Sequence, residues 1–477
     1  MPLPPEATPT PNAPTSPVAP RLGLWDAVSI IVGIVVGTTI FRGTAPVFDN
    51  AGGIWTALAI WLVGGLLTWC GALCYAELAT TYPRDGGDYE YLNRAYGRWC
   101  GFLFAWAQLA TIISGNIAIM AYAFADYGTR LWPAWNKHVP VVAFTAVLVL
   151  SALNALGVVA GKLTQNILTA TKVLGIAAIV LAGVGFSLAK SPIPPSFALP
   201  ATAAMSIPLA LVFVLYAFGG WSHAAYVAAE VRDQHKNIPR ALAFGIGGIT
   251  VTYLVVNATY AYVLDFGVAR RTLTPAADVM DHVFGPWGTN AVSKLVMLSA
   301  LGAINGMILT GTRIYAVWAA DYDALGWLAR WNRRRAAPIA AIVAQALVAV
   351  FLILLVGSYT GRQGFNLMLS SAGLQSVDWD RFNGGFETLV VGSAPLYWLL
   401  ALMTTVSVFI LRRRDPSIER PFRIPLYPLP VVLFCSTCLY MLYASLVYAQ
   451  WLSLIGFAPA IVGIVAWFLV RNGRPAV

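Results

Sequence analysis

The sequence contains few charged residues for its length. Only 10% of the 477 residues are Asp, Glu, Lys or Arg and 58% are hydrophobic, whereas a soluble domain carries about 25% charged residues. No soluble core of this size could hide so much apolar surface. The composition therefore excludes a water-soluble protein and predicts a membrane protein.

Cysteine is scarce as well, and five cysteines give no disulfide framework. All of them fall in or beside apolar stretches, which favours a role as small apolar side chains: Cys70, Cys74, Cys100, Cys435 and Cys438. The sequence also lacks a metal-ligand spacing, a nucleophile elbow and a phosphate-binding loop. An enzyme is therefore not expected, and neither is a metal or another cofactor.

The first 20 residues lack an apolar run and are rich in proline, threonine and alanine. A secretory signal peptide needs an apolar region of about 7–15 residues. Residues 1–20 are therefore expected to form a disordered cytoplasmic tail and not a signal peptide.

Long apolar stretches fill the rest of the chain. Since a membrane-spanning helix needs about 20 apolar residues, the sequence predicts an all-α polytopic membrane protein with about twelve transmembrane helices. The expected spans are 23–48, 54–80, 99–126, 139–158, 163–189, 204–229, 239–264, 290–320, 337–357, 386–411, 425–446 and 449–470. The polar link 358–385 is the longest external loop, and we expect a short surface helix in it.

Basic residues are concentrated on one side of these spans. If both termini are cytoplasmic, the cytoplasmic segments hold 19 of the 30 Lys and Arg residues and the external segments hold eight. The runs 333–335 and 412–414, each of three arginines, decide this orientation under the positive-inside rule. The net charge of +10 is thus an insertion signal and not the mark of a nucleic-acid-binding protein.

The first apolar span is interrupted at Gly37, which Thr38 and Thr39 follow directly. Gly33 and Gly37 are four residues apart, a spacing that also lets membrane helices pack closely. Packing alone does not explain the two threonines, which suit a kinked or unwound turn. If the helix opens here, the half that begins near Ile40 points its N-terminal amides at the gap, where they favour an anion such as a carboxylate.

A second apolar span is interrupted at Gly219 and Gly220, which aromatic residues flank at 216, 218 and 221. A half-helix that ends here exposes carbonyl groups, which suit an ammonium group; the alternative is a continuous helix with a packing glycine pair. Together the two breaks offer a cradle for a zwitterion. Broken helices at matching places in two halves are a strong sequence pointer to a transporter's binding site.

Lys172 lies ten residues into the fifth expected span, near the bilayer midplane. A lysine there costs at least about 2.5–3.5 kcal/mol, so it is a functional candidate by default. The alternative is a lysine whose side chain reaches the membrane surface, which is difficult from this depth.

The residues around the two breaks give the chain a resemblance to a known family. It resembles the amino acid–polyamine–organocation transporter family, and most of all its bacterial relatives of the L-type amino-acid transporters. The family motif Gly-Ser-Gly-Ile-Phe is matched by residues 37–41, and Phe-Ala-Tyr-Gly-Gly-Trp by residues 216–221. Further similar stretches make the resemblance cover nearly the whole chain: 77–78, 83–89, 95–97, 230–231, 237–242, 302–306, 309–311 and 420–425.

The resemblance implies two inverted five-helix repeats, 21–190 and 204–411, followed by two helices within 425–471, with the first and sixth helices discontinuous. It places the substrate carboxylate on Thr38 and nearby amides, the amine on carbonyls around the second break, and a gating aromatic at Tyr216. Thr39 departs from the family motif, where glycine stands, and narrows the pocket. The expected substrate-binding residues are Val35, Gly37, Thr38, Thr39, Ile40, Tyr216, Ala217, Phe218 and Gly219.

The resemblance also bears on coupling, because a lysine at the position of Lys172 takes the place of the sodium ion of sodium-coupled relatives. It implies a sodium-independent carrier in which Lys172 exchanges a proton or stays charged, so that proton symport and amino-acid exchange both remain open. No carboxylate lies at the predicted midplane, which favours a neutral amino acid as substrate. A non-transporting amino-acid sensor on the same fold is the alternative function, while a channel fits the gating aromatic poorly.

Partners and location follow from the resemblance alone. Animal L-type transporters are linked to a single-span subunit through a cysteine after the third helix, but the segment 127–139 contains none. No disulfide-linked accessory subunit is therefore expected, and the plasma or inner membrane is the expected location.

Overall fold

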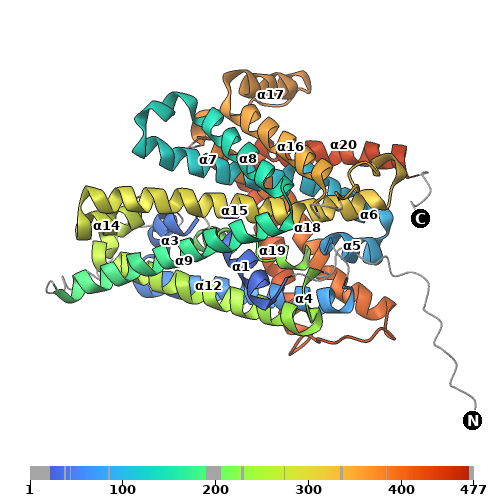
Figure 1. Ribbon diagram of the computed structural model, residues 1–477, viewed down its shortest axis with the longest axis horizontal. Helices are drawn as coiled ribbons and strands as arrows, with labels where there is room; N and C mark the ends of the chain where they lie inside the picture. The colour runs from blue at the N-terminus through green and yellow to red at the C-terminus, as the bar shows by residue number, and fades with distance from the viewer. Residues whose placement is uncertain are drawn as a thin grey trace, which may run out of the picture.

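The computed structural model describes residues 22–36, 39–42, 44–83, 86–189, 206–226, 230–272, 274–332, 337–382 and 384–471. Within these ranges the regular structure consists of helices, and no β-strand occurs (Figure 1). The expected tail 1–20 lies outside the described residues. The prediction of an all-α polytopic membrane protein is confirmed.

Nine helical segments among the described residues are long and apolar enough to cross a membrane. The last of them folds as two helices, α19 (Leu429–Ala449) and α20 (Leu454–Val470). The others are α4 (Ile54–Thr81), α6 with α7 (Arg98–Ala107 and Ile113–Leu131), α8 (Val139–Ala155), α9 (Val158–Ala189), α12 (Gln234–Leu264), α15 (Pro286–Ala320), α16 (Ile339–Gly357) and α18 (Gly384–Arg414).

The two remaining spans are interrupted, as the glycines predicted. The first consists of α1 (Leu24–Val35), α2 (Thr39–Arg42) and α3 (Thr44–Ala51). The sixth consists of α10 (Ile207–Ala217) and α11 (His223–Tyr226). With these two, the described residues account for all twelve expected spans, and the boundaries differ from the expected ones by five residues or fewer.

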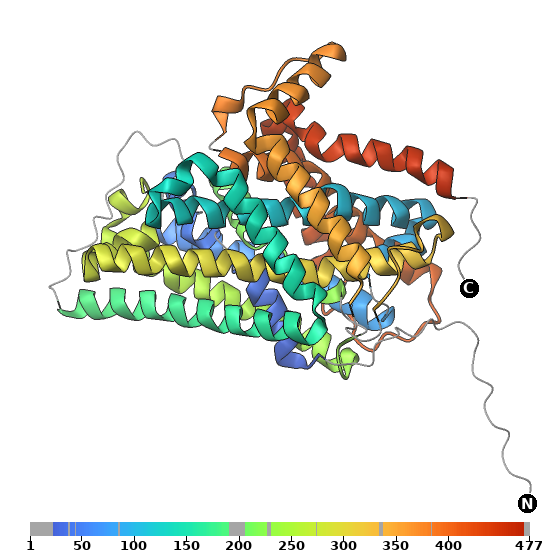
Figure 2. The ribbon, with the colours of Figure 1, turned by 45° about the horizontal axis from the view of Figure 1, so that its top comes forward.

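The elements recur in the same order in both halves of the chain. A short helix, α5 (Asp88–Tyr96), precedes the third span, and another, α14 (Pro275–Phe284), precedes the eighth. These third and eighth spans are long helical paths, with 34 and 35 residues. They pack against each other through α7 and α15, and α9 lies beside α15 and α12 in both views (Figures 1 and 2).

The long polar loop contains the expected surface helix, α17 (Tyr359–Ser371), which stands away from the bundle next to α16 (Figures 1 and 2). The shorter elements complete the description: the π-helical turn η1 (Gln108–Ile112), the 3₁₀ turns η2 (Pro133–His138), η4 (Asp323–Leu325), η5 (Trp379–Arg381) and η6 (Gln450–Ser453), and α13 (Phe266–Ala269).

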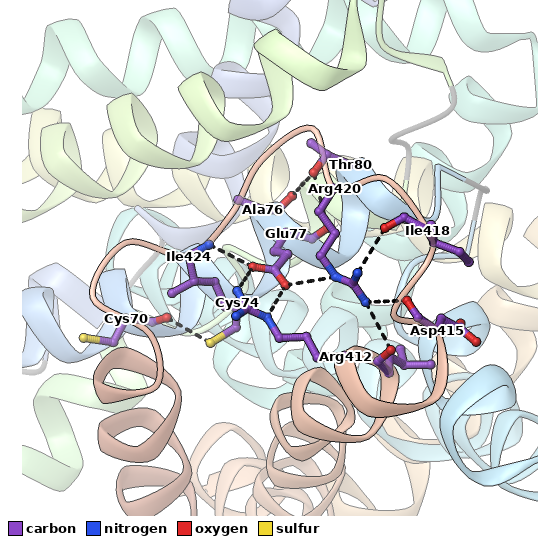
Figure 3. Close-up of polar contacts among 11 residues, drawn as sticks. Cys70, Cys74, Ala76, Glu77, Thr80, Arg412, Asp415, Ile418, Arg420 and Ile424 are labelled. Atoms are coloured by element: carbon purple, nitrogen blue, oxygen red, sulfur yellow. Dashed lines mark hydrogen bonds and ion pairs between the residues drawn. The ribbon is translucent and has the colours of Figure 1, made fainter.

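A buried carboxylate holds several elements together at one end of the bundle (Figure 3). We call this the arginine-rich end, because Arg412 and Arg420 lie there. Glu77 on α4 accepts hydrogen bonds from Arg412 Nε at 2.7 Å and Arg412 Nη2 at 2.5 Å. The backbone N–H of Ile424 also donates to it at 2.8 Å, and Arg420 Nε lies 3.6 Å away. One carboxylate thus fixes the end of α18 and the following loop to α4.

A second buried ion pair lies at the same end. Arg313 Nε on α15 donates to Glu230 Oε1 at 2.8 Å, and their side chains are 4% and 1% exposed. The backbone N–H of Leu22, just before α1, donates to the Glu230 carbonyl at 3.0 Å. Because breaking a buried pair costs about 3–5 kcal/mol, these contacts anchor the start of α1 and the segment after α11 to α15.

Candidate functional site

The first break leaves carbonyl groups at the end of α1 that the helix itself does not use. Lys172 Nζ on α9 donates to the Gly33 carbonyl at 2.7 Å, and Ser299 Oγ on α15 donates to the Val36 carbonyl at 3.2 Å. Both donor side chains are fully buried. Lys172 therefore does not reach a membrane surface; it stabilises the open end of α1, where an unpaired carbonyl would cost several kcal/mol.

A single hydroxyl group connects the two breaks. Tyr253 OH on α12 lies 3.0 Å from the Val35 carbonyl at the end of α1 and 3.1 Å from the Ala217 carbonyl at the end of α10. A phenol has one proton to donate, so the two carbonyls share it. Tyr253 holds the ends of the two half-helices close to each other, a role that the sequence did not reveal.

The second break brings its backbone directly against the first. The Gly219 N–H donates to the Tyr216 carbonyl at 3.0 Å, which closes a tight turn after α10. Gly220 has φ +99°, and a Cβ added there would lie 2.6 Å from Ile34 Cγ2. Only glycine fits this conformation and this close approach, so the close contact between the two breaks explains Gly220.

A cavity of about 90 Å³ lies between the two breaks. Four of the predicted site residues line it: Val35, Tyr216, Ala217 and Gly219. Residues from five other elements that the sequence did not single out for the site complete the wall, among them Ile112 on η1, Asn116 on α7, His223 on α11, Met307 on α15, and Ser393, Tyr397 and Trp398 on α18.

The other predicted residues lie elsewhere or outside the described structure. The Phe218 ring packs against the rings of Trp61 and Tyr253, with centroids 6.2 and 5.1 Å apart, so it lies behind the break and not in the cavity. Ile40 is fully buried in α2 and does not line the cavity. Gly37 and Thr38, and the side chain of Thr39, lie outside the described part of the chain.

The cavity wall is polar in places but carries no charged side chain among the described residues. The side chains of Asn116, Tyr216 and Tyr397 have no hydrogen-bond partner within the described ranges, so their polar atoms are available to a ligand. His223 Nδ1 is already paired with Thr310 Oγ1 at 2.7 Å. The site can therefore offer hydrogen bonds and apolar contacts to a neutral ligand, but no counter-charge to a charged side chain.

The sequence held a weak signal for one of the missed residues. Asn116 is one of two amides, with Gln108, in a mostly apolar span, and such polar groups in membrane helices tend to face a partner or a cavity. It follows the π-helical turn η1 by one turn of helix; π-turns are frequent at functional sites, but this one is not visible in the sequence. Nothing in the sequence marked Trp398 as a cavity residue, since an aromatic residue in an apolar span is usually part of the packing.

The chain is similar to a known protein family over most of its length. The family model described as amino acid permease matches residues 22–469. This chain belongs to the amino acid permease family. The permease is 29% identical over 427 residues to the b(0,+)-type amino acid transporter 1 of Mus musculus, and the match covers 88% of this chain and 82% of the relative.

A second group of relatives is similar to the permease over a longer stretch. The large neutral amino acids transporter small subunit 2 of Rattus norvegicus is 29% identical over 460 residues, covering 94% of this chain and 80% of the relative. The expected membership in the amino acid–polyamine–organocation family is confirmed. The expectation that the permease is not an enzyme is confirmed as well, because the family and these relatives are amino acid transporters.

Proposed function

We propose that this permease is a sodium-independent secondary transporter of neutral amino acids that works by alternating access. The family and the relatives support amino acid transport. The observation that carries the finer proposal is the cavity between two facing helix breaks, whose described wall has no charged side chain. An amino acid with a neutral side chain is the ligand that such a cavity matches.

The zwitterionic part of the substrate binds at the two breaks in this proposal. The amides of residues 37–40, at the start of the second half of the first span, take the carboxylate, as helix N-termini do. The carbonyl of Gly219, beside the cavity, takes the ammonium group. The Tyr216 carbonyl is less available, because it already accepts a hydrogen bond from the Gly219 N–H. The Ala217 carbonyl is less available, because Tyr253 already binds it.

The substrate side chain lies toward α7, α15 and α18. Asn116, Tyr216 and Tyr397 offer hydrogen bonds, while Met307 and Trp398 offer apolar surface. A cationic or anionic side chain would be desolvated here without a partner, which costs far more than the loss of an apolar contact. The mixed wall supports neutral substrates, both polar and apolar.

Lys172 supports the absence of sodium coupling. Its ammonium group already donates to the Gly33 carbonyl, so this carbonyl needs no metal ion as a partner. The ammonium group either stays charged through the cycle or exchanges a proton. Two modes are consistent with this arrangement: proton symport, and exchange of one amino acid for another.

The proposal includes the topology. The recurring order of elements supports inverted repeats at 21–190 and 204–411, with 425–471 as an addition. The arginine-rich end faces the cytoplasm under the positive-inside rule, which puts both termini there, in a plasma or inner membrane. The five cysteines are free thiols and none lies in segment 127–139, so the permease functions without a disulfide-linked subunit.

Uptake by purified permease in proteoliposomes tests the function. A panel of labelled neutral, cationic and anionic amino acids is offered with and without sodium, a pH gradient or internal amino acid. We expect uptake of neutral amino acids without sodium. Stimulation by external acid would indicate symport, and dependence on preloaded amino acid would indicate exchange. Binding without counterflow would replace the transporter by an amino-acid sensor.

Replacement of Tyr216 by alanine is expected to lower the kcat/KM of uptake about tenfold, equivalent to about 1.4 kcal/mol. The ring lines the cavity at the end of α10, where it closes over the substrate in the proposed cycle. Initial rates are compared at equal amounts of reconstituted protein. Tyr443→Ala, which removes a ring that is 66% exposed on α19, is the control; normal kinetics of Tyr216→Ala would contradict the gate.

A further inference from the structure

A second buried polar cluster lies outside the substrate cavity, around Asp88 at the start of α5. The Asp88 side chain is 1% exposed. The turn before it consists of Gly86 and Gly87, with φ +100° and +49°. A Cβ added to Gly87 would lie 2.7 Å from Tyr226 Cδ1 and 3.1 Å from the Ala225 backbone. This turn therefore packs closely against α11, the second half of the broken sixth span, and Asp88 follows directly after it.

Several polar atoms in this cluster lack a hydrogen bond of good geometry. Tyr75 OH on α4 donates to Asp88 Oδ1. Thr404 on α18 and Tyr226 on α11 face the same carboxyl group, yet no hydrogen bond of good geometry reaches Asp88 Oδ2, Thr404 Oγ1 or the hydroxyl of Tyr91. Unsatisfied buried atoms are rare in native proteins and point to an unseen ligand or a functional role.

The charge around Asp88 favours a proton as that ligand. The titratable groups that face it are Tyr75, Tyr91, Tyr226 and Tyr397. None of the ion pairs between described residues includes Asp88, whereas Glu90 is paired with Arg94 at 2.6 Å. Burial raises the pKa of Asp88 above its usual value, while the phenols stay neutral at working pH.

Two short contact paths lead from this carboxyl group, one to the second break and one to the substrate cavity. The Trp221 ring, in the second break, packs edge-on against the Tyr75 ring at 4.9 Å. The His223 ring, which lines the cavity, lies 5.0 Å from the Tyr226 ring. Movement of α11 therefore changes the cavity and the surroundings of Asp88 together.

We propose that Asp88 binds the proton that this permease co-transports with its amino-acid substrate. The protonated carboxyl group is stable while α11 covers it. When α11 moves away, water reaches the carboxyl group, the proton leaves toward the arginine-rich end, and the carboxylate is solvated. This inference rests on the proposed transport function and selects proton symport from its two modes.

The test uses the full-length permease in proteoliposomes, with labelled substrate outside and a pH-sensitive dye inside. For the unaltered protein we expect external acid to stimulate uptake and the lumen to acidify as substrate enters. For Asp88→Asn we expect acidification to disappear and gradient-driven accumulation to fall at least tenfold, while counterflow becomes independent of pH. The matched control is Glu90→Gln, a buried carboxylate two residues away that should keep the pH profile.

A second variant tests the same assignment even if Asp88→Asn fails to fold. Tyr75→Phe removes the hydroxyl that donates to the carboxylate and stabilises its charged form. We expect the midpoint of the pH profile to shift to higher pH, because the carboxyl group then holds its proton more firmly. An unchanged midpoint in Tyr75→Phe, or an unchanged pH response in Asp88→Asn, would overturn the assignment.

The outcomes also separate this inference from the proposed function. Counterflow of neutral amino acids by the unaltered protein without proton movement would leave transport standing and overturn the role of Asp88. Absence of both uptake and counterflow, for every amino acid offered, would overturn the transport function itself.

Discussion

Replacement of Lys172 by methionine or alanine is expected to lower the rate of amino acid uptake at least tenfold. The Lys172 ammonium group is the described donor to the Gly33 carbonyl, and both groups are buried. Removing it leaves a carbonyl unsatisfied, which costs about 1–3 kcal/mol, at the point where α1 must hold its open end. Methionine retains most of the volume, so it separates the lost charge from the cavity that alanine would leave.

Lys162 provides the control on the same helix. It pairs with Asp26 at 2.7 Å, but its side chain is 35% exposed, and a pair this exposed contributes only about 0–1 kcal/mol. Lys162→Ala should therefore keep uptake within about twofold, measured as initial rates at equal protein content. An unchanged rate and pH response in Lys172→Met would remove Lys172 from the mechanism.

The Lys172 and Asp88 variants together identify the proton-binding group. If Lys172 is a permanent charge, Lys172→Met slows transport, and whatever uptake remains still responds to pH. If Lys172 exchanges the proton, Lys172→Met loses the pH response while Asp88→Asn keeps it. Measuring both pH profiles in one preparation decides between the two groups.

Replacement of Tyr253 by phenylalanine is expected to lower the kcat/KM of uptake about tenfold. Its hydroxyl is shared by the Val35 and Ala217 carbonyls at the facing ends of the two breaks. Without it, a buried carbonyl loses about 1–3 kcal/mol of stabilisation, and the two half-helices lose their common contact. The loss of transport should exceed any loss of thermal stability, because the bond acts where the substrate binds.

Tyr260 on the same helix is a close control for that experiment. Its ring is fully buried, like that of Tyr253, but its hydroxyl has no hydrogen-bond partner among the described residues. Tyr260→Phe removes the same atom from the next part of α12 and should leave uptake within about twofold. Equal effects of the two substitutions would show that the bridge between the breaks is unimportant.

The sequence by itself determined the features that depend on the composition of a single segment. Apolar length predicted the spans, and the glycines predicted the openings of the first and sixth spans. Because a lysine amid apolar residues cannot be placed cheaply in lipid, its position predicted the burial of Lys172. The motifs at 37–41 and 216–221 also placed the chain in its family.

Only the tertiary structure decided which side chains meet. Tyr253 contacts a carbonyl 218 positions away, and Arg313 pairs with a glutamate 83 positions away. Asn116 and Trp398 reach the cavity from different spans, while Phe218, inside the family motif, turns away from it. Membrane helices that are apolar all round carry no periodic signal for their rotation, so the residues that face the centre are fixed by packing between spans.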